Sequence, residues 1–170
     1  MANEAGSGCN DLSAGIGGYT FISNVPASLS GNCDRLAFYG TADEGAANFA
    51  FFTRDGNDFT TVPGTRQTLT VTGSGGRCIE FNAPGDFTAF AVSEGNYLGA
   101  YVVDPNQDYT NAGGPDIWGD GGDYTDIDSQ TMTLHADHED ALTADITAAG
   151  GAAPTGTFFG PLCGPFGGVL

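Results

Sequence analysis

Basic side chains are almost absent from this sequence of 170 residues. It contains no Lys and only four Arg, against 21 Asp and Glu, and its formal net charge is −17. All four Arg lie in the first 77 residues, so nearly all of the uncompensated negative charge belongs to the second half. Such a protein repels nucleic acid and anionic membranes and attracts cations. Life in high salt, which screens repulsion, is an alternative explanation of the charge.

Long apolar runs are also missing. No stretch approaches the roughly 18 apolar residues of a membrane-spanning helix, and residues 1–18 contain neither a basic start nor an apolar run that would mark a secretion signal. We therefore expect no membrane span. If the protein is exported, its signal has been removed.

Catalytic motifs are lacking as well. The chain has no Gly-x-Ser-x-Gly elbow, and its two histidines share one acidic turn, so a Ser-His-Asp triad has little support. No glycine-rich phosphate loop leads into a helix. We expect a protein that is not an enzyme.

The cysteines are few and far apart. No two of Cys9, Cys33, Cys78 and Cys163 form a C-x-x-C metal motif, and their even number predicts two disulfides in a secreted protein. Three connectivities are open. We favour Cys9 with Cys33 and Cys78 with Cys163, because these pairs tie down both terminal segments. Four free thiols in a cytosolic protein are the alternative.

Short β-type runs separated by turn residues dominate what is present. They recur every eight to twelve residues, which indicates an all-β, jelly-roll-like β-sandwich of about 8–10 short antiparallel strands. Runs 48–53 and 97–103 are apolar at both parities and are expected to be central strands, whereas runs 67–72 and 130–136 alternate and are expected to be half-buried. The expected core consists of Phe49, Phe51, Phe87, Phe90, Val92, Leu98, Tyr101 and Val102.

Three regions are expected along the chain. Residues 1–17 are Gly-rich and predicted to be flexible, residues 18–150 form the sandwich, with 142–148 as a strand rather than a helix, and residues 151–170 form an apolar Gly/Pro-rich tail. The tail has no charge to keep it in water, so it must pack on its own sheet or on a neighbouring subunit.

A Gly-rich acidic stretch from residue 104 to 128 has no Lys or Arg within it. Carboxylates crowded in one loop repel one another, and Ca²⁺, which takes six to eight oxygen ligands, would relieve that repulsion. The predicted ligands are Asp104, Asp108, Asp116, Asp120, Asp123, Asp126 and Asp128. A solvated acidic loop without metal is the alternative.

Two further candidate sites lie near this stretch. Asp137, Glu139 and Asp140 share one acidic turn and are predicted to form a second cation site, unless the turn is simply solvated. Trp118 and Tyr124 are candidates for a platform that stacks on a sugar ring, although a lone Trp more often anchors its loop to the core.

Two functions fit these features. The first is a secreted, calcium-binding structural subunit of a self-assembling filament, tube or surface layer, a homo-oligomer in which Ca²⁺ neutralises the repulsion between copies. The second is a calcium-stabilised carbohydrate-binding β-sandwich module with a polysaccharide as its partner.

Overall fold

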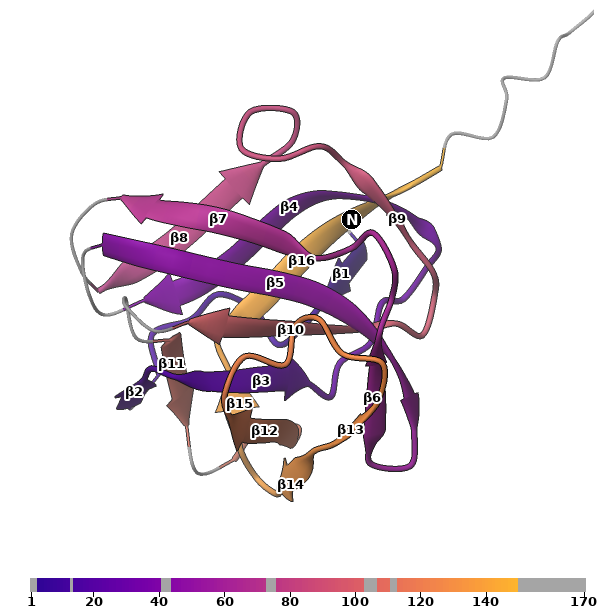
Figure 1. The fold of residues 1–170 in the computed structure, drawn as a ribbon. Coiled ribbons are helices and arrows are strands. Elements are labelled where there is room, and N and C mark those ends of the chain that lie inside the picture. The colour runs from indigo at the N-terminus through magenta and orange to yellow at the C-terminus, as the bar shows by residue number, and fades with distance from the viewer. Residues whose placement is uncertain are drawn as a thin grey trace, which may run out of the picture.

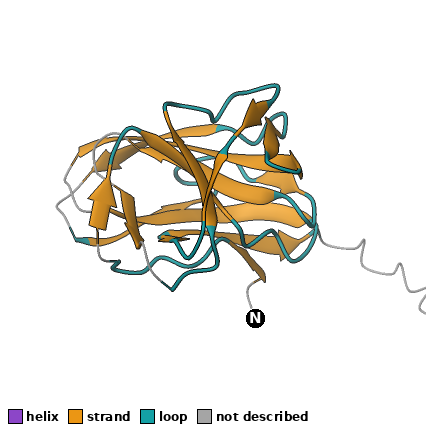
Figure 2. Cartoon of the chain, turned by 90° about the horizontal axis from the view of Figure 1, so that it is seen from below, coloured by secondary structure: helices purple, strands orange, loops and turns teal. Residues whose placement is uncertain are grey.

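The protein is all-β in the computed structural model, which describes residues 3–12, 14–40, 44–72, 76–102, 107–110 and 113–149. Sixteen strands and no helix occur in these residues, and accordingly they contain no helix that could cross a membrane. The strands form two antiparallel sheets that pack face to face (Figures 1 and 2). This arrangement is consistent with the expected β-sandwich.

The first sheet has the order β1-β16-β4-β11-β15, with β2 beside β11 and with β8 and β9 beside β4. Its strands are β1 Asn3–Ala5, β2 Ala14–Ile16, β4 Gly31–Gly40, β8 Arg77–Asn82, β9 Phe90–Val92, β11 Gln107–Thr110, β15 Glu139–Asp140 and β16 Leu142–Ala148.

The second sheet has the order β13-β6-β5-β10-β3-β12-β14, with β7 beside β5. Its strands are β3 Tyr19–Ser23, β5 Glu44–Asp55, β6 Asp58–Thr61, β7 Gln67–Thr72, β10 Tyr97–Val102, β12 Ile117–Gly121, β13 Gln130–Thr131 and β14 Thr133–His135.

Two hydrophobic clusters lie on opposite faces of the second sheet. The main core fills the space between the sheets, and β5 contributes Phe49 and Phe51 to it. The alternate residue Phe52 points to the outer face, where it packs with Phe59 and Trp118 in a second cluster that the chain from 122 to 132 covers (Figure 1). This double burial explains why β5 is apolar at both parities.

Much of the strand prediction is confirmed. The central runs 48–53 and 97–103 correspond to β5 and β10, which are paired on both edges, and 142–148 is the strand β16. Six of the eight expected core residues are buried, while Phe90 is partly buried and Tyr101 half-exposed.

Three expectations differ from the structure. The segment 1–17, expected to be flexible, contributes β1 and β2, and the stretch 104–128, expected to be a loop, contains β11 and β12. The run 130–136 is not one strand, because it breaks at the buried Met132 into β13 and β14 and leaves Leu134 44% exposed. The predicted tail, 151–170, lies outside the described residues.

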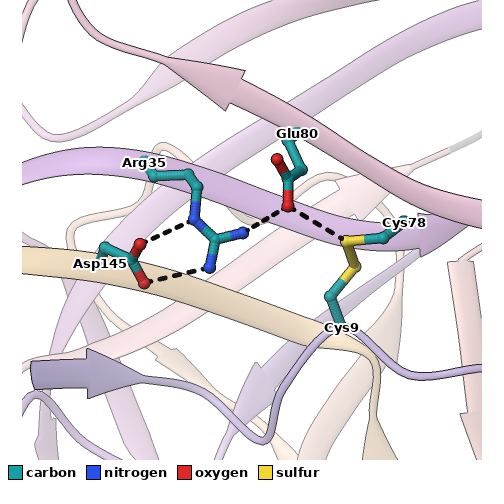
Figure 3. Close-up of a disulfide and its surroundings, with 5 residues drawn as sticks. All are labelled: Cys9, Arg35, Cys78, Glu80 and Asp145. Carbon is teal, nitrogen blue, oxygen red and sulfur yellow. Dashed lines mark hydrogen bonds and ion pairs between the residues drawn. A yellow bond between two sulfur atoms is a disulfide. The ribbon is translucent and has the colours of Figure 1, made fainter. Parts of the chain in front are cut away.

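The expected pairing of Cys9 with Cys33 is wrong. Cys9 is bonded to Cys78 (Figure 3), and Cys33 is a free thiol with no exposed surface. The reason is that the two side chains lie on opposite faces of the first sheet: Cys33 points from β4 into the core, whereas Cys78 alternates in β8 with the core residues Ile79 and Phe81 and so faces the outer side. The expected partner of Cys78, Cys163, lies outside the described residues.

Candidate functional site

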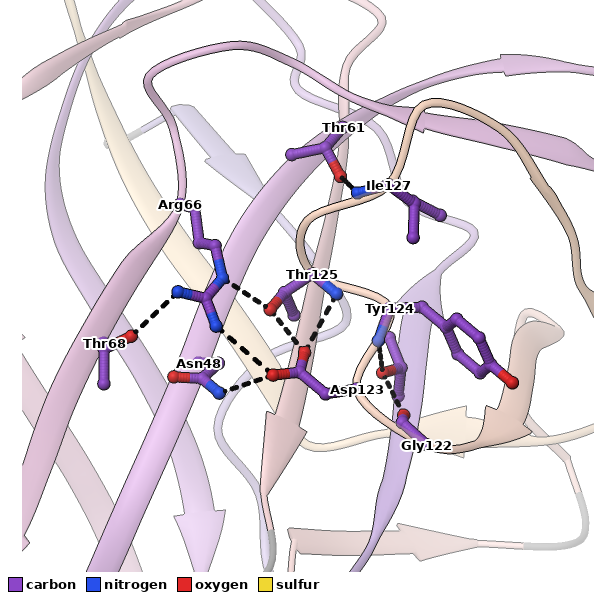
Figure 4. Close-up of polar contacts among 10 residues, drawn as sticks. Asn48, Thr61, Arg66, Thr68, Gly122, Asp123, Tyr124, Thr125 and Ile127 are labelled. Atoms are coloured by element: carbon purple, nitrogen blue, oxygen red, sulfur yellow. Dashed lines mark hydrogen bonds and ion pairs between the residues drawn. The ribbon is translucent and has the colours of Figure 1, made fainter.

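One carboxylate of the acidic stretch, that of Asp123, is neutralised by an arginine that directly precedes β7. Arg66, 57 residues earlier, donates to Asp123 at 3.3 Å, and Asn48 donates to the same oxygen at 2.8 Å (Figure 4). Thr125 donates to the other oxygen through its backbone N–H and its hydroxyl. Burial raises the pKa of Asp123, but the bonds from Thr125, the charge of Arg66 and the bond from Asn48 together hold that pKa below its usual value.

Two more aspartates of the stretch accept hydrogen bonds from neighbouring strands and turns. Asp120 accepts from the backbone N–H and the hydroxyl of Thr133, and Asp116 accepts from the backbone N–H of Asp137 at 2.8 Å. These carboxylates therefore join β12 to β14 and one turn to another. They are placed along the sheet edge rather than gathered around one point.

The remaining predicted ligands show no convergence. Asp126 and Asp128 are exposed, and their carboxylates accept no hydrogen bond from the described residues. Asp104 lies outside the described part of the chain, as does the side chain of Asp108. Within the part that is described, no three His, Cys, Asp or Glu side chains come close enough to hold a metal ion.

The predicted second cation site is divided between two faces of β15. Asp140 has no exposed surface, its neighbour Glu139 is half-buried, and Asp137 stands exposed in the preceding turn. Successive residues of a strand point to opposite faces, so Glu139 and Asp140 cannot bind the same ion as a pair.

The predicted sugar platform on Trp118 is wrong. Its ring is 2% exposed and lies under the guanidinium of Arg54, 3.9 Å from the ring centroid. Phe59 and Tyr97 contact the same ring, and the half-buried Tyr124 packs against this second cluster. Trp118 thus fixes β12 and the loop after it to the sheet, which is the anchoring role that a lone Trp more often has.

An aromatic pocket lies elsewhere, where the β3–β12–β14 edge of one sheet meets β11 of the other. Its cavity of about 170 Å³ is lined by Tyr19, Phe21, Tyr109, His135 and His138. We call this site the aromatic pocket. The rings follow one another at centroid distances between 5.4 and 6.2 Å. Tyr19 is 38% exposed and gives the pocket an open side.

Glycines in β12 make room for two of these rings. Gly119 pairs with Phe21 and Gly121 with Tyr19 across the β3–β12 ladder. A Cβ atom at Gly119 would lie 2.5 Å from the Phe21 ring, while the Tyr19 ring lies over Gly121 at van der Waals distance. An aromatic ring that packs on a cross-strand glycine is held in place by the sheet itself.

Backbone carbonyls orient both histidines of the aromatic pocket. Nε2 of His135 lies 3.1 Å from the Gly119 carbonyl oxygen, and Nδ1 of His138 lies 2.8 Å from that of Ala136. A carbonyl oxygen only accepts, so each of these nitrogens carries a proton and donates it. In a neutral ring the other nitrogen, Nδ1 of His135 or Nε2 of His138, is then an acceptor. The His138 ring also stacks on Tyr109 with an angle of 7° between the planes.

Backbone strain gathers next to the same pocket. Asp116 and Asp137 have positive φ angles of 73° and 60°, and among the described residues they are the ones other than glycine that do. Their turns are interlocked, because Asp137 donates its N–H to Asp116 and accepts from the N–H of Gly114. Strain of this kind concentrates at functional sites, where the surrounding structure holds it.

A larger hollow of about 300 Å³ lies beside the disulfide but offers less to a ligand. Its lining includes Arg77, Glu80 and Asp86. Glu80 already pairs with Arg35 at 2.8 Å (Figure 3), and Asp86 accepts from the backbone N–H of Asn82. These charges are engaged with the protein itself, so the aromatic pocket is the better candidate site.

Comparisons with known proteins identify no relative: no protein-family model, curated protein or solved structure matches this chain.

Proposed function

We propose that this protein is a secreted, non-enzymatic binding module that holds one sugar ring of a polysaccharide in the aromatic pocket. The observation that carries the proposal is the set of five aromatic and imidazole rings around one open cavity. A cavity of about 170 Å³ is smaller than the roughly 300–1,000 Å³ pockets of drug-sized ligands. A cavity of this size suits a single sugar ring of a polysaccharide chain.

The chemistry of the pocket matches a sugar in two respects. The flat C–H faces of a pyranose pack on aromatic rings, and Tyr19, which is partly exposed, offers such a ring at the entrance. The hydroxyl groups of the sugar need hydrogen-bond partners, and the acceptor nitrogens of His135 and His138 supply them in fixed orientations.

Secretion is part of the proposal. The Cys9–Cys78 disulfide is a bond that persists outside the reducing cytosol, and extracellular polysaccharides are ligands found in the same place.

Affinity electrophoresis in gels containing different polysaccharides tests this function. We expect at least one neutral polysaccharide to retard the wild-type protein, and Tyr19→Ala to remove most of the retardation, since loss of an aromatic platform leaves the fold intact. Tyr101→Ala is the matched control, because Tyr101 is also a half-exposed tyrosine of the second sheet but lies outside the pocket. Equal retardation of wild type and Tyr19→Ala would refute the proposal.

Calcium-dependent self-assembly is the second candidate, and the charge favours it. A chain with net charge −17 keeps its copies apart until divalent cations neutralise it. The exposed carboxylates of Asp126 and Asp128, which accept no hydrogen bond from the described residues, are the available Ca²⁺ ligands.

Light scattering and negative-stain imaging before and after addition of millimolar CaCl₂ test this candidate. Polymers should appear with CaCl₂ but not with NaCl of equal ionic strength, and Asp126→Asn/Asp128→Asn should assemble less than the control Asp11→Asn/Asp55→Asn, which removes the same charge from two other exposed positions. Monomers under all conditions would exclude assembly driven by Ca²⁺.

A further inference from the structure

A fully buried carboxyl lies in the layer between the two sheets. Asp140, in β15, has no exposed surface, and neither of its carboxylate oxygens has a hydrogen bond from the described residues. Its cross-strand neighbour is Tyr109 of the aromatic pocket. Buried polar groups are nearly always satisfied, so two open oxygens on one carboxyl require a further partner.

Two hydroxyls lie against this carboxyl. The oxygens of Ser7 and Ser23 are 3.0 Å apart, and Ser23, at the end of β3, is fully buried. Both hydroxyls are close enough to Asp140 to lower its pKa, although burial raises that pKa more strongly. Neither hydroxyl reaches the carboxylate with normal hydrogen-bond geometry, so both keep lone pairs that a cation beside Asp140 could use.

Backbone hydrogen bonds hold the N-terminal segment next to Asp140 and Ser23. Gly6 donates its N–H to Val25 at 2.9 Å, and Gly8 donates to Leu142 at 2.9 Å, so Ser7 is held from both sides. Gly6 has φ 92° and packs so closely on Leu142 that a Cβ atom there would clash with its carbonyl. The backbone on both sides of Ser7 is therefore fixed, and this fixes the position of its hydroxyl oxygen.

We propose that the Asp140 carboxylate and the hydroxyls of Ser7 and Ser23 form a buried site for a monovalent cation such as Na⁺. Oxygen donors of this kind suit a hard cation. One carboxylate balances a single positive charge, whereas a divalent ion would leave an uncompensated charge in the protein interior, at a high desolvation cost.

Thermal unfolding at pH 8 in NaCl and in tetramethylammonium chloride of equal ionic strength tests this site. Both salts screen charge to the same extent, but the tetramethylammonium ion is too large to enter. We expect Tm of the wild type to be at least about 3 °C higher in NaCl, since an ion bound only by the folded state stabilises it. Asp140→Asn should melt at the same temperature in both salts.

Two further variants keep the test decisive. Asp55→Asn removes an exposed carboxylate and should keep the full preference for NaCl. Ser23→Ala removes one oxygen of the site without touching Asp140 and should reduce the preference, which matters if Asp140→Asn fails to fold. Equal Tm of the wild type in both salts, or an unchanged preference in both Asp140→Asn and Ser23→Ala, would overturn the proposal.

Discussion

At the scale of single residues, the partners of a carboxylate decide its role. Asp123 and Asp140 are both aspartates of the second half, yet Asp123 is held ionised by Arg66 and Thr125, whereas Asp140 is enclosed without any cationic side chain among the described residues. Sequence alone places both in acidic runs. The difference arises because the fold brings Arg66, which directly precedes β7, to Asp123, and no local sequence pattern reveals this contact.

The burial of Asp140 has a consequence for stability as a function of pH. Burial, as the largest effect, raises its pKa from 3.8 to about 7. The folded protein therefore holds a proton that the unfolded chain loses, so this contribution to stability is complete below pH 3.8 and is lost as the pH rises through 7. At 1.36 kcal/mol for each pKa unit, the loss amounts to roughly 4 kcal/mol.

The variant Asp140→Asn should remove this pH dependence. In sodium-free buffers containing tetramethylammonium chloride, we expect Asp140→Asn to gain stability relative to the wild type between pH 4 and pH 8, because the amide needs no proton. Denaturation by urea at several pH values measures the difference. A difference in unfolding free energy that is constant over this range would contradict the assignment of a raised pKa to Asp140.

At the scale of elements, cross-links and glycines determine the positions of segments and rings that the hydrophobic pattern does not determine. The strands β1 and β2 are each three residues long and could not hold the N-terminal segment by themselves. The disulfide between Cys9 and Cys78 attaches the segment between β1 and β2 to β8. Similarly, Gly119 of β12 determines where the Phe21 ring can lie.

Removing this cross-link should destabilise the protein considerably. The two cysteines are separated by 69 residues, so a chain-entropy estimate gives a loss of about 4 kcal/mol for Cys9→Ser/Cys78→Ser. Cys33→Ala is the control, because it breaks no cross-link and removes one sulfur from the core, at a cost of about 1–2 kcal/mol. Guanidinium denaturation under non-reducing conditions measures the unfolding free energies of both variants and of the wild type. Equal stability of the double variant and the wild type would show that the disulfide does not restrain the fold.

At the scale of the whole molecule, the sequence predicted the layers better than the site. The sandwich could be predicted because β5 and β10 are apolar at both parities, and only a strand covered on both faces requires that pattern. The strands β11 and β12 lack such a pattern, since β11 is mostly polar and the second half of β12 consists of Gly and Asp. They were therefore expected to be loop.

The aromatic pocket could not be predicted because its residues come from three separate segments. Tyr19 and Phe21 alternate in β3, and Gly119 and Gly121 alternate in β12, which is the one local signal of rings packed on glycines. Nothing in the sequence states that these two strands are neighbours or that Tyr109 and His138 face them from elsewhere. In contrast, Trp118 attracted attention as a lone tryptophan, and it serves as an anchor on the opposite face of the sheet.

NMR titration tests most directly whether the aromatic pocket binds a sugar ring, as proposed. Assigned ring signals are followed while an oligosaccharide fragment of the retarding polysaccharide is added. We expect shifts for Tyr19, Tyr109, His135 and His138, with unchanged signals for Tyr97 and Trp118 of the second cluster. Saturable shifts confined to Trp118 and Tyr97, or no shift in the pocket rings at saturating sugar, would contradict it.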